Sequence, residues 1–461
     1  MKFYDREEEI SILRENEHLA ERNAMFTVLM GRRRVGKTAL VTKAFEDKQY
    51  AYLFVSKDSE PILCGKFQQA LEEQLGIHVY GQLTHFRDLF EVVMRESQKR
   101  HFTVVIDEFQ NLYKINPAIF SEMQDLWDRL HRESRINLVT MGSIRSLMKR
   151  IFEEEGEPLY GRPTSKFTLR PFAIEVLKQI FRDHAPDYRN EDLLCLYMIT
   201  GGVAKYVELL MDAECYTKEK MLNYVCRRDS YFLTEGRDLM NQEFSDESAT
   251  YFSILQLIAG GLNRRSDIDG AMQRDMGTFL QNLEKNYSVV SRLKPLLAKP
   301  GSKTTSYEIS DQFLRFWFRF IWPYQSLVER GQLTLLKQNI VRGYEQFTGR
   351  TLEQYFQTMA METGKYSMVG NWWDRDRRRS ERRAELARAI PSDKEEGVAK
   401  GENEIDMIAL NEFEHSGLVA EIKRNPDKLN PADLCRKVEL LPTSDFGRYK
   451  LTLGGFSIDD M

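Results

Sequence analysis

Residues 31–38 of this 461-residue chain read GRRRVGKT, a complete phosphate-binding loop of the form GxxxxGK[ST]. Gly31 and Gly36 allow the backbone to curl so that successive N–H groups point at one phosphate. Lys37 adds a positive charge that can reach the outer phosphates, and the Thr38 hydroxyl is placed to ligate Mg²⁺. We expect the whole loop to contact the nucleotide: Gly31, Arg32, Arg33, Arg34, Val35, Gly36, Lys37, Thr38 and Ala39.

The loop lies between a predicted strand and a predicted helix. Residues 25–30, MFTVLM, form a short apolar run that is typical of a buried strand. Residues 38–47, TALVTKAFED, carry apolar side chains at helical spacing. A glycine turn with a chance lysine is the alternative, but this context favours nucleotide binding. We expect ATP rather than GTP, because the chain shows no NKxD-type guanine-reading motif in the expected place.

The composition is that of an intracellular globular chain with the length of about three domains. Its 66 basic and 70 acidic residues give a net charge of −4, which argues neither for nor against nucleic acid. The five cysteines form no CxxC pair, which indicates reduced thiols rather than a disulfide framework or a zinc site. No signal peptide is visible, and no stretch reaches the ~18 apolar residues that span a bilayer. We expect a soluble, cytoplasmic protein without membrane contact.

The first half of the chain alternates strand-like runs with helical patterns. Such alternation predicts a parallel sheet covered by helices, which is an α/β fold. The expected strands are residues 25–30, 50–56, 102–108, 136–143 and 166–169.

The strand FTVVIDE carries the second half of the predicted site. Asp107 and Glu108 lie at its carboxyl end, which is the edge where open α/β sheets bind ligands. There Asp107 would hold Mg²⁺ through water, and Glu108 would orient or deprotonate the water that attacks the γ-phosphate. An apolar run ending in acids is weak evidence alone, but downstream of a phosphate-binding loop it predicts hydrolysis of the nucleotide.

Two further polar residues are candidates for the same site. Ser143 ends the strand INLVTMGS and could contact the γ-phosphate or the attacking water; a strand that simply ends in turn residues is an equal alternative. Arg162, in PLYGRP, could stabilise charge on the γ-phosphate as arginine fingers do. A solvated loop arginine explains the same residue equally well.

These motifs occur in order with FYDREEEISIL near the start, LYGR followed by LRPF, and TGGVAKYVEL at residues 200–209. Together they resemble the archaeal-type ATPases of the STAND class of P-loop NTPases. The resemblance implies catalysis by Glu108 beside the Mg²⁺-linked Asp107. It also implies that Phe3, Arg6 and Gly201–Gly202 flank the nucleotide. We expect a P-loop domain over residues 1–175 and a helical lid over 176–244.

Residues 245–326 change character. Three helical patterns, the second with Ser266 as a plausible N-cap, precede two short strands, which is the plan of a winged helix. Basic residues here could face DNA phosphates, but nearby acids and the use of winged helices as protein contacts are the alternative. These basic residues are Arg264, Arg265, Arg274, Lys294, Lys299 and Lys303.

Residues 327–461 contain the pattern EIDMIALNEFEHSGLVAEIK, which predicts a β-hairpin. A turn centred between Phe413 and Glu414 puts Asp406 opposite Glu421 and Glu404 opposite Lys423, so these four side chains share one face of the sheet. Two or three carboxylates and a lysine on one face suit a Mg²⁺-dependent phosphodiesterase, although solvated charges on an exposed face give the same pattern.

This hairpin resembles the D…ExK core of PD-(D/E)xK nucleases, and the region resembles the domain of unknown function 234 that follows many archaeal-type ATPases. The resemblance implies a further metal ligand on a helix, which Glu353 provides in this chain. Asp406, Glu421 and Lys423 match the core without substitution. One departure is an arginine-rich stretch at residues 374–388, either an inserted helix that touches nucleic acid or a solvated excursion.

The sequence therefore leaves two main hypotheses of function. In the first, a Mg²⁺–ATP cycle controls a nuclease-like domain that acts on DNA. In the second, the protein is a nucleotide-regulated switch or scaffold that binds a protein partner or a second copy of itself. A kinase-type P-loop enzyme is disfavoured, because kinases seldom need a glutamate such as Glu108 beside Asp107.

Overall fold

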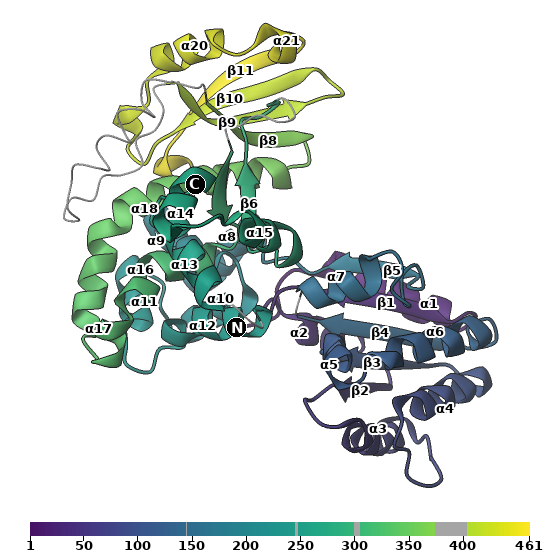
Figure 1. Cartoon of the computed structure of the whole chain (residues 1–461). Coiled ribbons are helices and arrows are strands. Elements are labelled where there is room, and N and C mark those ends of the chain that lie inside the picture. Colours follow the sequence, from purple (N-terminus) through teal and green to yellow (C-terminus); the bar gives the residue numbers. More distant parts are fainter. Residues whose placement is uncertain (144, 245–247, 299–304, 374–402) are drawn as a thin grey trace. The chain divides into compact units, whose positions relative to one another are not determined.

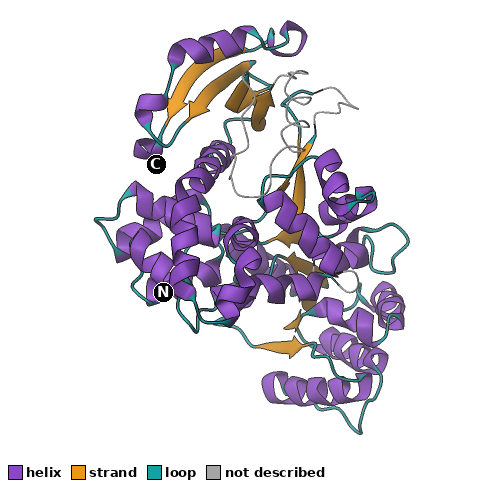
Figure 2. Ribbon diagram, turned by 60° about the vertical axis from the view of Figure 1, so that its left-hand side comes forward, coloured by secondary structure: helices purple, strands orange, loops and turns teal. Residues whose placement is uncertain are grey.

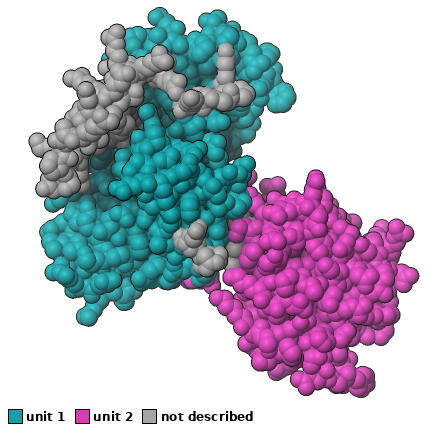
Figure 3. Space-filling view, in the orientation of Figure 1, with its two compact units in different colours: residues 1, 172–202, 206–461 teal, residues 2–171, 203–205 magenta. Residues whose placement is uncertain are grey.

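The computed structural model describes residues 1–143, 145–244, 248–298, 305–373 and 403–461. The chain divides into two compact units (Figure 3). The N-terminal unit comprises residues 2–171 and 203–205, and the C-terminal unit comprises residues 1, 172–202 and 206–461. The predicted division into four domains, with boundaries at residues 175, 244 and 326, stays a prediction.

The N-terminal unit is built on a five-stranded parallel sheet (Figure 1). Its strands are β1 (Met25–Met30), β2 (Tyr50–Phe54), β3 (Phe102–Asp107), β4 (Ile136–Gly142) and β5 (Ser165–Thr168). All five match the predicted strands to within two residues. The strand order is β2-β3-β4-β1-β5, so β4 separates β1 from β3. The segment after β4 therefore lies between the loop after β1 and the acids at the end of β3.

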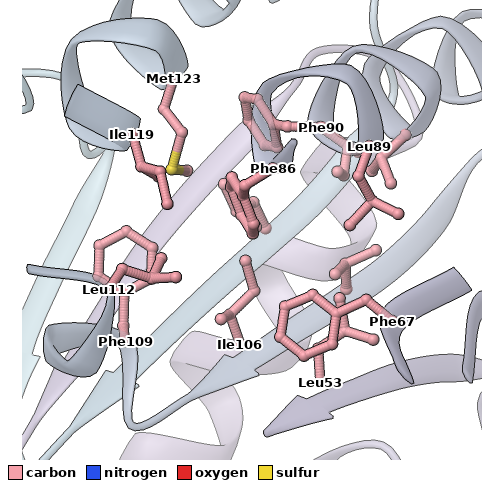
Figure 4. Packing of buried hydrophobic residues seen from close by; sticks show 14 of the residues in the cluster. Leu53, Phe67, Phe86, Leu89, Phe90, Ile106, Phe109, Leu112, Ile119 and Met123 are labelled. Atoms are coloured by element: carbon pink, nitrogen blue, oxygen red, sulfur yellow. The ribbon is translucent and has the colours of Figure 1, made fainter. Parts of the chain in front are cut away.

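Helices cover both faces of this sheet because successive strand side chains point to opposite sides. Val105 and Val139 pack with α1 and α2 on one face. Val104 and Ile106 pack on the other face in the aromatic-rich core (Figure 4). The helical elements are α1 (Glu7–Ala20), α2 (Lys37–Ala44), α3 (Glu60–Leu75), α4 (Phe86–Lys99), η1 (Phe109–Asn111), α5 (Leu112–Ile115), α6 (Ala118–Leu130) and α7 (Arg145–Glu153).

The first part of the C-terminal unit is mainly helical (Figure 2). Its first helices are α8 (Ile174–His184), α9 (Asn190–Thr200), α10 (Ala204–Asp212, which starts in the N-terminal unit), α11 (Lys218–Val225) and α12 (Phe232–Glu243). They are followed later by α16 (Gln312–Phe320), η3 (Trp322–Tyr324), α17 (Gln325–Glu329) and α18 (Leu333–Glu362). Trp317 of α16 is fully buried, and a Cβ at Gly236 would lie 2.2 Å from its indole ring, so α12 and α16 are in close contact.

Between α12 and α16 lie three short helices and a two-stranded antiparallel sheet. They are α13 (Ser248–Ala259), α14 (Arg265–Met272), α15 (Gly277–Gln281), which continues into the π-helical turn η2 (Asn282–Asn286), and the strands β6 (Val290–Leu293) and β7 (Ser306–Ile309). The N-cap of α14 is Arg264. The predicted cap, Ser266, is instead a residue of the first helical turn. The order of elements is the one predicted; the winged-helix assignment itself stays a prediction.

The chain ends in a four-stranded sheet of order β11-β10-β9-β8. Its strands are β8 (Met368–Trp373), β9 (Glu404–Asn411), β10 (Ser416–Ile422) and β11 (Lys450–Phe456). β8, β9 and β10 pair antiparallel, whereas β10 and β11 pair parallel. The crossover before β11 contains α20 (Pro431–Glu439), and the short elements around it are η4 (Pro426–Lys428), α21 (Thr443–Phe446) and η5 (Ile458–Asp460).

The register of this hairpin confirms the predicted turn position. Ser416 pairs with Asn411 and Ala420 pairs with Met407, and the next step along the same register sets Glu421 opposite Asp406.

Some of the residues discussed from the sequence lie outside the described residues: the arginine-rich stretch at residues 374–388, Lys299 and Lys303. Within the described part of the chain, none of the helices is both long and apolar enough to cross a membrane.

The close packing at the end of β4 makes a stability prediction. A Cβ at Gly142 would lie 2.3 Å from Met148 Sδ and 2.4 Å from Gln110 Oε1. Overpacking of this kind costs about 1–3 kcal/mol, so Gly142→Ala should speed hydrogen exchange in peptides from β1 and β4. Gly65→Ala is the matched control, because a Cβ there meets nothing within 4 Å and helix α3 gains propensity. Equal exchange in the two variants would contradict this packing.

Candidate nucleotide site and C-terminal charge cluster

The phosphate-binding loop joins β1 directly to α2. Gly36, at the N-cap of α2, has φ of 104°, which a glycine adopts without strain. Gly31 passes so close to β5 that a Cβ there would lie 2.9 Å from Leu169 O. Lys37 Nζ donates hydrogen bonds to Gly31 O at 2.8 Å and to Arg32 O at 3.2 Å. The ammonium group therefore lies against its own loop, where an incoming phosphate can replace the two carbonyl groups.

The surroundings of Lys37 change the pKa of its ammonium group. Burial lowers the pKa of Lys37 to about 8, and the negative charges of Glu108 and Asp107 oppose this shift. A phosphate group bound to the loop would add further negative charge beside the ammonium group. Phosphate binding should therefore raise the pKa of Lys37 again.

Asp107 ends β3 and is buried. Its Oδ1 accepts a hydrogen bond from Glu108 N at 2.8 Å, and its Oδ2 accepts one from the Tyr52 hydroxyl of β2. Burial raises the pKa of Tyr52, whereas the Thr38 side chain, which lies beside the same hydroxyl, acts to lower it. Thr38 and Asp107 thus lie within reach of one hydroxyl group.

This pair of oxygen donors fits Mg²⁺. Mg²⁺ in nucleotide sites needs only one or two protein oxygens, with phosphates and water completing the shell. Thr38 and Asp107 would supply these oxygens. The sequence pattern predicted both residues but not Tyr52, because an alternating Tyr-Ala-Tyr strand carries no signal beyond β-propensity.

Glu108 is held firmly beside Asp107. Its backbone is left-handed, with φ of 53°, which is uncommon for a residue other than glycine. Ser143 Oγ lies 3.0 Å from both carboxylate oxygens, and Gln110 Nε2 donates to Oε2 at 2.5 Å. Ser143 therefore contacts the predicted catalytic acid rather than standing alone at the strand end. Gln110, buried just after the strand, escaped sequence reasoning because a single glutamine forms no pattern.

Arg162 lies at the opposite edge of the sheet, which contradicts its predicted role at the γ-phosphate of the same chain. Its guanidinium pairs with Asp128 at 3.0 Å and donates to Tyr160 O at 2.9 Å. It precedes β5, whose carboxyl end at Thr168 lies beside Met30 and the phosphate-binding loop. Arg162 precedes the start of β5 at Ser165, so it lies at the amino-terminal edge of the sheet, away from that loop.

Two segments near the phosphate-binding loop agree with the positions that the resemblance implied. Arg6 is buried and donates to Arg170 O at 2.7 Å, at the carboxyl edge of the sheet, while Phe3 is exposed. Gly201 and Gly202, with φ of 55° and 77°, lead into residues 203–205. Lys205 N donates to Arg34 O at 3.1 Å, so these three residues pack on the loop. Contact of either segment with the nucleotide stays a prediction.

The C-terminal sheet brings Asp406, Glu421 and Lys423 together. Lys423 Nζ lies 2.7 Å from Asp406 Oδ2 and 2.7 Å from Glu421 Oε2. Both carboxylates are buried, and Asp406 Oδ2 also accepts a hydrogen bond from Ile422 N at 2.9 Å. The Lys423 ammonium group thus bridges the two acids, whose carboxylate oxygens are of the ligand type that Mg²⁺ binds.

The other charged groups of this cluster differ from the prediction. Lys437 of α20 donates to Glu421 Oε1 at 2.6 Å and was not predicted. Glu353 of α18 is buried but is bonded to Arg350 at 2.6 Å. Within the described residues no three His, Cys, Asp or Glu side chains form a group that could hold a metal ion. The structure thus offers two carboxylates at this position, and Glu353 as a third ligand stays a prediction.

Comparison with known proteins identifies the N-terminal part. Residues 3–210 match the family described as an ATPase domain predominantly from Archaea. This part of the chain is similar to the archaeal-type ATPase domain. Residues 317–431 match a second family, described as archaeal and bacterial proteins of unknown function. The archaeal-type ATPase domain and this C-terminal region are the pair that the sequence motifs resembled.

Other known proteins are similar to this chain over most of its length. An uncharacterized protein of Methanocaldococcus jannaschii, MJECL04, is 28% identical over 468 residues, which cover 98% of this chain and 95% of the relative. The Walker-type ATPase PABY2304 of Pyrococcus abyssi has a similar fold, with a TM-score of 0.50 and 19% identity over 69% of this chain and 96% of its own. The ORC2 protein of Aeropyrum pernix, in ADPNP and ADP complexes, has a TM-score of 0.45 and 14% identity, over 72% of this chain and 96% of its own.

The pKa of Lys37 predicts how nucleotide affinity depends on pH. Below pH 8 the ammonium group is charged before ATP or ADP arrives; above pH 8 the nucleotide-free protein must first take up a proton. Affinity should therefore fall by up to about tenfold per pH unit above pH 8. Calorimetric titration of ADP in buffers of different ionisation enthalpy would measure both the affinity and the proton uptake.

Lys37→Arg is the control for this titration. Arginine stays protonated throughout this range, so the slope above pH 8 should disappear even if the variant binds ADP more weakly. A wild-type affinity that does not change between pH 8 and 10 would contradict the placement of Lys37 at the phosphates.

Proposed function

We propose that this ATPase couples a Mg²⁺–ATP cycle to a DNA-directed, nuclease-like module at its carboxyl end. The observation that carries the ATPase part is the meeting of Lys37, Thr38, Asp107 and Glu108 at one edge of one sheet. The observation that supports the nuclease-like part is the shared position of Asp406, Glu421 and Lys423.

The ATPase chemistry follows from this geometry. The loop amides and Lys37 bind and orient the phosphates, and Thr38 and Asp107 hold Mg²⁺, which supplies charge neutralisation when it is bound. Glu108 can accept a proton from the attacking water. Ser143 and Gln110 fix the direction of the Glu108 carboxylate before nucleotide arrives. Such preorganisation lowers the cost of reaching the reactive geometry.

The role of Glu108 has a direct test. Glu108→Gln keeps the size and the contact with Ser143 but removes the basic carboxylate. Phosphate release should fall by about 100-fold or more, while ATP affinity stays within about threefold of wild type. Glu153→Gln is the control, because Glu153 pairs with Lys166 and takes no part in the site. Phosphate release that survives unchanged in Glu108→Gln would exclude this residue as the base.

The order of elements in the C-terminal sheet supports the nuclease-like assignment. Helix α18 precedes three antiparallel strands, and α20 leads to a fourth strand parallel to the third. Asp406 lies on the second strand of this set and Glu421 and Lys423 on or just after the third. In such a site the carboxylates would hold a divalent cation and Lys423 would offset charge on a phosphodiester.

A continuous set of contacts supports coupling between the two activities. Arg424, next to Lys423, donates to Glu191 of α9 at 2.7 Å and to Thr348 of α18 at 2.6 Å. Asn190 of α9 also donates to Ile458 O at 2.8 Å, near the chain end. The carboxyl end of α9 leads through two glycines into residues 203–205, which pack on the phosphate-binding loop. We infer that α9 carries the effect of the nucleotide to the sheet.

A second candidate function is a nucleotide-regulated interaction module that binds a protein partner or a second copy without cleavage. Lys437 and Arg350 favour it, because they neutralise Glu421 and Glu353. The predicted DNA-contacting arginines favour it as well. Arg265 is paired with Asp275 at 2.6 Å, and Arg274 donates to Thr250 Oγ1 at 2.9 Å. Both guanidinium groups are therefore engaged by side chains of the same predicted winged-helix region.

Incubation of the full chain with supercoiled plasmid, Mg²⁺ and ATP separates the two functions. The nuclease proposal predicts nicked or linear DNA with the wild type, and at least a 100-fold loss in Asp406→Asn and in Lys423→Ala, with phosphate release retained. Asp427→Asn is the control, since this acid is exposed a few residues downstream. No cleavage by the wild type with ATP, ADP or neither would exclude the nuclease and leave the interaction module.

A further inference from the structure

Tyr52 lies where the two protein ligands for Mg²⁺ come together. Its hydroxyl donates a hydrogen bond to Asp107 Oδ2, and the Thr38 side chain lies beside it. Thr38 comes from the first turn of α2 and Asp107 from the end of β3, so Tyr52 joins two elements that the metal must also join. The sequence motifs for phosphate and metal binding do not include this residue.

The position of Tyr52 is fixed from several sides. β2 pairs in parallel with β3, and Tyr52 stands beside Val105, two residues before Asp107. Its backbone N–H donates to Gln74 Oε1 of α3 at 2.8 Å. The side chain packs against the core between the sheet, α1 and α2. The hydroxyl is therefore held at the site by the strand and not by a mobile loop.

The hydrogen bond from Tyr52 leaves lone pairs of the Asp107 carboxylate available to the metal. A carboxylate has about four lone-pair positions, and Asp107 uses one for Glu108 N and one for Tyr52. The remaining positions can accept metal-bound water. A phenol with the ordinary pKa of about 10 is protonated near neutral pH, so Tyr52 can donate this hydrogen bond.

We propose that Tyr52 is a positioning residue for Mg²⁺: its hydroxyl orients Asp107 toward Thr38 so that the metal–nucleotide complex binds a preformed pair of oxygens. The proposal rests on the nucleotide site described above and adds a function for β2. Partners that orient metal-binding groups are worth about 10–100-fold in metal affinity or activity when removed.

The test is Tyr52→Phe, which removes only the hydroxyl. ADP affinity is measured by displacement of a fluorescent ADP analogue in excess Mg²⁺ and in EDTA. The gain in affinity that Mg²⁺ gives the wild type should shrink by about tenfold in the variant, while affinity in EDTA is unchanged. Tyr50→Phe is the matched control, because Tyr50 lies on the same face of β2 and its ring contacts Phe45 instead.

A double variant separates positioning from folding. In an Asp107→Asn background, Tyr52→Phe should have no further effect on the Mg²⁺-dependent affinity, because the group that it orients is gone. An unchanged or larger Mg²⁺ effect in Tyr52→Phe alone would overturn the proposal. So would equal losses in Tyr50→Phe and Tyr52→Phe. A wild type whose ADP affinity is the same in Mg²⁺ and EDTA would overturn both the proposal and the metal site beneath it.

Discussion

The parallel pairing of β1, β4 and β3 brings the carboxyl ends of three adjacent strands to one edge, and the nucleotide site depends on this pairing. β1 delivers the phosphate-binding loop, β3 delivers Asp107 and Glu108, and β4, between them, delivers Ser143. The strand order also explains why position 142 is a glycine. A Cβ at this point would meet both Met148 and Gln110, the residue that holds Glu108. The strand order thus fixes the position of Glu108, the proposed catalytic acid, as well as that of the loop.

At this edge of the sheet, the charged side chains are held in place before the nucleotide binds. Lys37 is buried against carbonyl groups, and the negative charges of Asp107 and Glu108 favour its charged form. Asp107 and Glu108 are each held by hydrogen-bond donors from other elements, Tyr52 and Ser143. Because these groups are ordered in advance, binding energy need not be spent on arranging them.

From the sequence we could predict the strands and those side chains whose positions follow from their spacing along the chain. The bounds of β1, the position of Asp107 and the hairpin register that pairs Asp406 with Glu421 all follow from short-range patterns. Contacts between side chains on different strands depend on the order of the strands in the sheet, and short-range patterns do not predict this order. Tyr52 and Gln110 form no motif, and the predicted role of Arg162 was wrong because the direction of β5 decides which edge the arginine occupies. Lys437 reaches Glu421 only through the crossover helix α20.

A structure of the full chain with Mg²⁺ and a non-hydrolysable ATP analogue tests the central claim most directly. Our account predicts that the phosphates lie on the loop amides and that Lys37 Nζ leaves Gly31 O for the outer phosphates. It also predicts that the metal lies between Thr38 and Asp107, with Glu108 facing the γ-phosphate. A nucleotide bound elsewhere, with Lys37 still hydrogen-bonded to Gly31 and Arg32, would contradict it.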